Sequence, residues 1–255
     1  MVLNLIPYQI DVWGLSDIGI VRQNNEDVWS ELPKHQFYAI ADGMGGHQAG
    51  EVAAKEAIKN LCALIDQTLE HTQPSLSQLK KIIYQSIKRM NLAVYKLSRT
   101  SPDYKGMGTT LCCLAFHPDG LIYAHVGDSR IYRLRKNKLV QLTKDHSLLR
   151  QLLEKGQLSE GEAPHFAYKN IITKAIGTEA SVEPAVRHTF VEPGDMFLMC
   201  TDGLTDLLTN KEITDTLSEF STPAEIAQEL VLKANRLGGY DNITVVVAKT
   251  TPLHE

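Results

Sequence analysis

The sequence has no long apolar run and no excess of basic residues, and each shortage excludes a class of protein. No stretch approaches the roughly 18 consecutive apolar residues that a membrane helix needs. The N-terminus carries no basic segment or processing site of the kind found in signal peptides. A net charge of -4 disfavours a polyanionic partner. We therefore expect a cytoplasmic protein with no membrane or nucleic-acid partner.

Patterns for zinc fingers, disulfide frameworks and nucleotide loops are missing as well. The cysteines lie in apolar segments at spacings that fit neither a zinc motif nor a disulfide set, so we expect reduced core residues. They are Cys62, Cys112, Cys113 and Cys200. A dinucleotide fingerprint would require glycine where Gln48 stands, and a P-loop would require lysine and a hydroxyl residue after Gly50.

The sequence does contain enough apolar residues for one sizeable core. Its 255 residues are 43% hydrophobic, which predicts a single domain over residues 1–255. The hydrophobic period alternates between short extended runs and longer helical stretches. Strands are expected at residues 9–15, 37–41, 110–116, 121–126, 130–134, 138–142, 196–201 and 243–249. Short links between several of them indicate antiparallel hairpins.

Helical periodicity predicts two long helices between the second and third expected strands, and another near the C-terminus. The first covers residues 48–65, and the second opens at Ser75 with Gln78 as its capping-box partner. The last opens at Thr222 and carries an apolar stripe from Ile226 to Leu237. Runs of strands followed by runs of helices favour an α+β fold in which helices cover antiparallel sheet.

Three aspartates, far apart in the chain, each stand in a turn beside an apolar segment. They are Asp42 in ADGMGGH, Asp202 in CTDGL and Asp241 in GGYDNITVVV. Carboxylates crowded together without a cation would repel each other and lose hydration, whereas hard ions such as Mg²⁺ or Mn²⁺ prefer oxygen ligands. The backbone carbonyl of Gly43 is a further candidate ligand. The pattern predicts a divalent metal site.

Two other polar segments have both a structural and a functional interpretation. Arg22, in RQNNED, has a guanidinium fork that suits two phosphate oxygens, although a single arginine is usually a surface residue. Asp128, in VGDSR, lies between two expected strands and equally fits a tight hairpin turn. Taken singly, neither segment decides between these interpretations.

Taken in order, the motifs resemble those of the metal-dependent protein phosphatases, the type-2C-like serine/threonine phosphatase family, in its bacterial-type branch. The resemblance runs from about residue 12 to 247 and covers RQNNED, ADGMGGH with the following GE, GMGTT, VGDSRIY, LTKDHS, CTDGL and GGYDNITVVV. It implies a four-layer α-β-β-α sandwich, with two antiparallel sheets flanked by helical pairs. It also implies a binuclear Mn²⁺ or Mg²⁺ centre at one end of the sheets.

The resemblance assigns metal-binding roles position by position. Asp42 resembles the carboxylate that bridges two Mn²⁺ or Mg²⁺ ions, and Gly43 resembles a backbone carbonyl ligand. Asp202 and Asp241 resemble ligands of the second ion. Asp128 matches the residue that, with Asp202, holds a weaker third metal in bacterial-type members.

The remaining transferred roles concern water and phosphate. Glu26 and Asp27 match residues that hold metal-bound waters, and Arg22 matches the phosphate-binding arginine. Met44 stands where the eukaryotic branch has a histidine assigned to protonate the leaving oxygen. His47 is therefore our candidate for the general acid or for orienting substrate, with capping of the following helix as the alternative.

The implied activity is hydrolysis of phosphoserine and phosphothreonine in proteins by direct attack of a hydroxide held between the two metals. No covalent phosphoenzyme is needed, and no cysteine nucleophile motif is present. We expect a monomer that opposes a serine/threonine kinase, with a flap subdomain at residues 145–180. A catalytically silent regulator that binds phosphoproteins is the alternative, and a nucleotide-hydrolysing enzyme is a third hypothesis.

Overall fold

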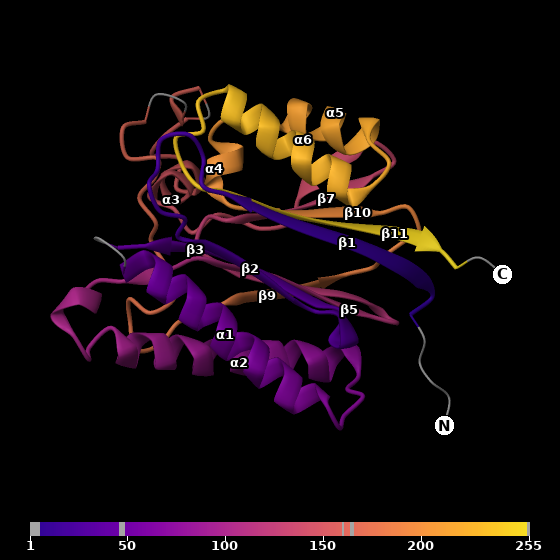
Figure 1. Cartoon of the computed structure of the whole chain (residues 1–255), viewed down its shortest axis with the longest axis horizontal. Coiled ribbons are helices and arrows are strands. Elements are labelled where there is room, and N and C mark those ends of the chain that lie inside the picture. The colour runs from indigo at the N-terminus through magenta and orange to yellow at the C-terminus, as the bar shows by residue number, and fades with distance from the viewer. Residues whose placement is uncertain (1–5, 46–48, 160, 164–165, 254–255) are drawn as a thin grey trace.

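The expected strands assemble into two stacked antiparallel sheets in the computed structural model (Figure 1). The structure describes residues 6–45, 49–159, 161–163 and 166–253. One sheet, called sheet A, has the order β1-β11-β10-β7-β8. Its strands are β1 (Tyr8–Asp17), β11 (Ile243–Pro252), β10 (Met196–Cys200), β7 (Arg130–Arg135) and β8 (Lys138–Gln141). Both ends of the chain therefore pair with each other, since β1 runs antiparallel to β11 along its whole length.

The second sheet, called sheet B, carries most of the N-terminal half. Its order is β2-β3-β5-β6-β9, and the short β4 pairs with the end of β3. The strands are β2 (Asp27–Leu32), β3 (Phe37–Met44), β4 (Gly108–Thr109), β5 (Leu111–His117), β6 (Gly120–Val126) and β9 (Ala185–Thr189). β5 and β6 are buried along their whole length, which explains their uninterrupted apolar sequence.

Helices cover the outer face of each sheet, so the molecule has four layers (Figure 1). α1 (Ala49–Leu69) and α2 (Leu76–Leu97) pack on sheet B, and α5 (Asn210–Glu219) and α6 (Pro223–Arg236) lie over sheet A. α3 (Leu148–Glu154) and α4 (Asp202–Thr205) lie at the end of the sandwich away from the chain termini. Separate apolar clusters fill the space between the sheets and beneath each helical pair.

The predicted α+β fold, a four-layer sandwich with antiparallel sheets and flanking helical pairs, is confirmed. The capping box at Ser75 and Gln78 forms as expected, and Thr222 opens α6 through a second box. Leu237 was wrongly included in the buried stripe, because it caps α6 and is 48% exposed. The sequence pattern did not predict β2, β4, β9, α3, α4 or α5. Within the described residues, no helix has the length and apolarity to cross a membrane.

Candidate metal centre and phosphate site

The first two candidate carboxylates are brought together by the pairing of β2 with β3. Asp27 begins β2 and lies directly opposite Asp42 near the end of β3. The backbone continues this pairing, since the Gly43 amide donates to the Glu26 carbonyl over 3.1 Å. Residues that are more than a dozen positions apart thus become neighbours at one end of sheet B.

Hydroxyl residues hold the backbone of Asp42 in place. The Asp42 amide donates to Thr110 Oγ1 over 3.0 Å, and its carbonyl accepts from the Thr109 hydroxyl over 2.8 Å. The Thr110 hydroxyl is in turn 2.7 Å from the Ser129 hydroxyl, next to Asp128. The GTT and GDS motifs therefore have a structural role, because they connect the two turns that carry candidate ligands.

A hydrogen bond between the sheets places Asp202 near the same end of the sandwich. Thr201, which follows β10 in sheet A, donates from its hydroxyl to Asp27 Oδ2 over 2.9 Å. The same hydroxyl accepts the Thr244 amide over 3.0 Å, which fixes the turn against β11. Asp202 comes next in the chain and begins α4. Asp202 is therefore positioned by the bonds of Thr201 to Asp27 and Thr244, which are distant in the sequence.

Asn242 organises the N-terminal loop around Asp241. Its Nδ2 donates 2.9 Å bonds to the carbonyls of both Ile18 and Asn24, and its Oδ1 accepts the Glu26 amide over 2.8 Å. Asn242 is buried, so these bonds form away from water. One side chain thus places the segment that carries Arg22 and Glu26 against the turn that carries Asp241.

Two glycines in the motifs are needed because backbones approach each other closely. A side chain at Gly43 would collide with the Gly50 carbonyl, where α1 begins. A side chain at Gly203 would collide with the carbonyl of Asn242. Any Cβ at these positions would push α1 or α4 away from the acidic residues.

The acidic residues raise one another's pKa. Burial raises the pKa of Asp42 well above its usual range, and the charges of Asp27, Asp202 and Asp128 raise it further. Burial also raises the pKa of Asp27 to about 7 and that of Asp202 to about 6. For Asp202 the neighbouring Asp241 adds to this rise, while a hydrogen bond to Asp42 opposes it. The fold has therefore concentrated negative charge where water is scarce.

Arg22 lies at the open edge of this acidic cluster. Its Nη2 donates to Asp241 Oδ2 over 2.7 Å, and half of its side chain is exposed. The other oxygen of Asp241 accepts the Asn242 amide over 2.8 Å. A cavity of about 410 Å³ opens beside Arg22 and is lined also by Asp202, Asp241 and Lys169. An anionic group entering it would meet the guanidinium fork at the mouth.

Asp128 lies on a buried turn beside the same cluster. Burial and then the charge of Asp202 raise the pKa of Asp128 to about 7. Its Oδ1 is buried without a hydrogen-bond donor among the described residues. A buried carboxylate oxygen without a donor is costly, and a cation would satisfy it.

The donor set fits hard divalent ions. It consists of carboxylates and a nearby backbone carbonyl, the ligands preferred by Mn²⁺ and Mg²⁺, and it includes the unpartnered oxygen of Asp128. As the side chains lie, no three acidic, histidine or cysteine residues of the described segments already converge as a cage. Asp241 faces Arg22 instead. This ion pair would have to open around a cation.

The structure thus brings the predicted site residues to one end of the sandwich. These are Arg22, Glu26, Asp27, Asp42, Gly43, Asp128, Asp202 and Asp241. Their individual roles stay predictions, and His47 lies outside the described residues. The sequence predicted no role for the supporting residues Thr110, Thr201 and Asn242. Each lies inside a quoted motif, GMGTT, CTDGL or GGYDNITVVV, and that membership was the available signal.

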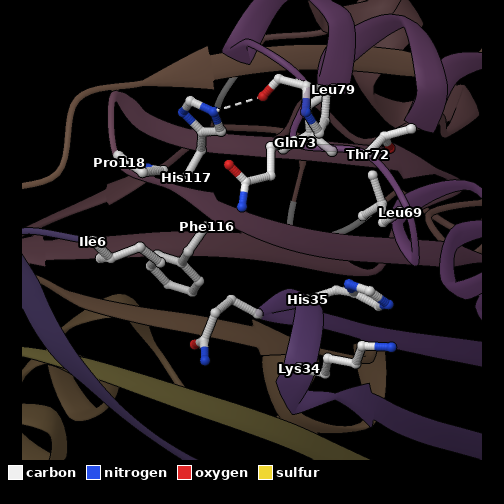
Figure 2. Close-up of a pocket in the computed structure, with 12 residues that line it drawn as sticks. Ile6, Lys34, His35, Leu69, Thr72, Gln73, Leu79, Phe116, His117 and Pro118 are labelled. Carbon is white, nitrogen blue, oxygen red and sulfur yellow. Dashed lines mark hydrogen bonds between the residues drawn. The ribbon is translucent and has the colours of Figure 1, made fainter. Parts of the chain in front are cut away.

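A second cavity lies at the other end of sheet B and carries no comparable chemistry. It measures about 260 Å³ and is lined by residues just before β3, around the connection between α1 and α2, and at the end of β5. Figure 2 shows Phe116 and Ile6 on one side of it and Lys34 and His35 on another. The His117 ring is already bonded to the Pro74 carbonyl at 3.0 Å, and His35 is paired with Asp66. Both histidines of this cavity therefore already have hydrogen-bond partners within the fold.

Comparison with known proteins points to the same family along most of the chain. The model of the protein phosphatase 2C family matches residues 19–235. A putative protein phosphatase 2C-type from Streptococcus pyogenes is 37% identical over 235 residues, which cover 91% of this chain and 94% of that protein. Protein phosphatase PhpP of Streptococcus pneumoniae is 37% identical over 237 residues and also covers 91% of this chain and 94% of its own length.

Solved structures extend the likeness to three dimensions. The serine/threonine phosphatase of S. agalactiae superposes with a TM-score of 0.87 at 38% identity, covering 94% of this chain and 99% of its own. The catalytic domain of phosphatase PstP, in complex with two manganese ions, superposes with a TM-score of 0.84 at 36% identity, covering 95% and 98%. The chain belongs to the protein phosphatase 2C family of metal-dependent serine/threonine phosphatases.

Proposed function

We propose that this protein phosphatase 2C member removes phosphate from serine and threonine side chains of proteins at the cavity beside Arg22. The observation that carries the proposal is the convergence of carboxylates from both sheets on one end of the sandwich, with the guanidinium at its edge. Mn²⁺ or Mg²⁺, when bound there, would supply an activated water and positive charge for the phosphoryl group. Phosphorylated proteins are accordingly the expected substrates.

Each residue of the proposed site has a separate task. Asp42, Asp202, Asp241 and the Gly43 carbonyl would hold the ions, and Asp128 with Asp202 would hold a weaker third. Glu26 and Asp27 would orient water next to them, because Asp27 is itself fixed by the Thr201 hydroxyl at 2.9 Å. Arg22 would bind two phosphoryl oxygens and orient the phosphorus toward that water. A kinase that opposes this activity, a monomeric state and a cytoplasmic location stay predictions.

The decisive experiment measures phosphate release from a phosphothreonine peptide with Mn²⁺ present. We expect turnover by the natural protein and a loss of about 10²-fold or more in kcat/KM for Asp42→Ala, because an ion ligand that contributes several kcal/mol is removed. Asp215→Ala is the matched control. That aspartate lies on the surface of α5, pairs with Lys211 at 2.6 Å, and should be dispensable.

The silent-regulator alternative makes the opposite prediction. A regulator would bind the phosphopeptide in a calorimeter without releasing phosphate, and Asp42→Ala would leave that behaviour unchanged. Binding without Mn²⁺-dependent turnover by the natural protein would refute the proposed hydrolysis. The intact set Asp42, Asp202, Asp241 and Arg22 supports catalysis, since a phosphopeptide binder has no need of three clustered carboxylates.

A further inference from the structure

Exposed apolar side chains gather around the cavity that holds Arg22. Of the twelve large apolar residues of the described segments that are well exposed, five line this cavity or stand within two positions of a residue that does. They are Ile20, Val21, Tyr168, Ile171 and Tyr240. Single exposed apolar residues are ordinary, but a group at one site marks a surface that binds something.

Three of these residues form a fixed strip, which we call the apolar rim: Ile20, Val21 and Tyr240. They are 66%, 59% and 65% exposed. The backbone amides of Ile20 and Val21 both donate to the Gly239 carbonyl, over 2.8 and 3.3 Å, so the two segments lie side by side. Because the backbone is held on both sides, the rim presents its side chains without a large ordering cost.

The apolar rim is continuous with the proposed phosphate site. Arg22 follows Val21 directly, and Asp241 follows Tyr240, and these two residues are joined by the 2.7 Å ion pair. Tyr240 itself lines the cavity. A phosphorylated side chain bound at Arg22 would therefore place the backbone that carries it, and its neighbouring side chains, against Ile20, Val21 and Tyr240.

The segment on the other side of the cavity has a similar composition. Lys169 lines the cavity and bonds Asp206 at 3.2 Å, which ties this segment to the residues after α4. Exposed Tyr168 and Ile171 flank it, and Ile171 is anchored where its carbonyl accepts the Leu148 amide over 2.8 Å. Exposed apolar residues thus stand next to cavity-lining residues in both segments, beside the ion pairs Arg22–Asp241 and Lys169–Asp206.

We propose that the apolar rim binds apolar side chains immediately before and after the phosphorylated residue, and so sets the sequence preference of the enzyme. The proposal rests on the proposed function and refines it. Its occupant is a phosphorylated peptide segment and not a second copy of the chain, because the rim is a strip of three residues. A stable protein interface instead needs about 20 to 30 residues a side.

The test compares two phosphothreonine peptides that differ only at the residues flanking the phosphothreonine, which are leucine in one and serine in the other. We expect kcat/KM for the leucine peptide to be about 5- to 30-fold higher, the range for partial burial of one or two aliphatic side chains. Val21→Ser and Tyr240→Ser should each bring this ratio toward one. Taking the ratio within each variant cancels any change in the chemical step that both peptides share.

Phe190→Ser is the matched control, since Phe190 is 74% exposed and follows β9, whose last residue pairs with the start of β6 away from Asp128. It should keep the natural ratio. Equal hydrolysis of both peptides by the natural protein would overturn the inference while leaving the proposed function standing. Hydrolysis of neither peptide would refute the proposed function and the inference with it. A loss of dimers on Val21→Ser, with the peptide ratio unchanged, would assign the rim to self-association and overturn the proposal.

Discussion

Arg22 and Asp241 satisfy each other in this structure, although each is proposed to serve a different partner. The arginine fork is suited to phosphate and the carboxylate to a cation, yet they meet at 2.7 Å. Both side chains are partly exposed, so the pair itself adds little stability. The contact is therefore better understood as competition, because a cation held by Asp241 would leave Arg22 free to bind the substrate.

Replacing Arg22 by alanine should separate these two effects. We expect kcat/KM to fall about 10- to 150-fold, since hydrogen bonds to charged groups contribute about 1.5 to 3 kcal/mol. The Kd for Mn²⁺ should decrease, because Asp241 Oδ2 loses its competing partner. Steady-state kinetics and titration calorimetry measure the two quantities. Weaker Mn²⁺ binding would show that Arg22 supports the metal site, and Arg99→Ala, which removes a surface arginine next to Tyr95, is the control.

Asp202 and Asp128 should differ in how strongly they connect Mn²⁺ to stability. Asp202 lies close enough to Asp42 for its charge to raise the pKa of Asp42, and it is proposed to hold an ion of the pair, whereas Asp128 is proposed to hold only a weaker third ion. At a hundredfold excess over Kd, Mn²⁺ should raise the Tm of the natural protein by about 5 to 10 °C. Calorimetry should find this shift abolished in Asp202→Asn and mostly kept in Asp128→Asn. Equal losses would undo the assignment of a weaker third site.

The segment between β8 and α3 is fastened to the turn that carries Asp128. The His146 amide donates to the Gly127 carbonyl over 2.9 Å, and the Gly127 amide donates to His146 Nδ1 over 3.1 Å. The His146 ring stacks on His125 with 4.6 Å between centroids. Arg130 adds two bonds to Asp145 Oδ2, over 2.9 and 2.7 Å. The first residues of the predicted flap are thus rigidly attached.

His146→Ala tests the importance of this double contact. The buried Gly127 amide would lose its acceptor, so we expect the free energy of unfolding to fall by about 1 to 3 kcal/mol in urea denaturation. The Asp128 turn should loosen as well, and Mn²⁺ binding at the proposed third site should weaken. His146→Gln, which offers another acceptor, should recover part of the loss. His188→Ala, a change on the exposed face of β9, is the control. If His146→Ala is as stable as this control, His146 does not hold the Asp128 turn.

The acidic cluster makes the stability of the whole molecule depend on pH. Asp27 and Asp128 have a pKa of about 7 and Asp202 of about 6 in the fold, against an unfolded value of about 3.9. The folded state therefore binds more protons between these values. The stability that comes from this proton binding is fully present below about pH 4 and is lost as the pH rises through 7.

Metal-free protein should consequently become less stable between pH 6 and 8, and Mn²⁺ should stabilise it more at pH 8, where protons no longer compete for the carboxylates. Urea denaturation in chelator at both pH values measures the slope. Burial lowers the pKa values of His125 and His146, so these two residues make stability rise with pH up to about pH 6.5. The slope of Asp27→Asn, compared with that of the natural protein, isolates the contribution of the carboxylate. A slope for Asp27→Asn as steep as for the natural protein would refute the assignment.

The local patterns that succeeded are those that depend on neighbours in the chain. The helix from Ser75 was predictable because its capping box and its apolar stripe lie within a few turns of each other. β2 was missed because its residues 27–32 mix charged and apolar side chains at a half-exposed edge, which removes the periodic signal. α4 was missed because four residues are too short to show a helical period.

The sequence by itself determined the family, the layered fold and which carboxylates form the candidate centre, because each lies in a short motif of fixed order. Only the tertiary structure decided that Thr201 reaches Asp27 across 174 positions and that Asn242 accepts the Glu26 amide across 216. Such contacts depend on how two sheets stack, and stacking is set by the packing of the whole core. No local pattern encodes which buried donor will face which acceptor once the chain has closed.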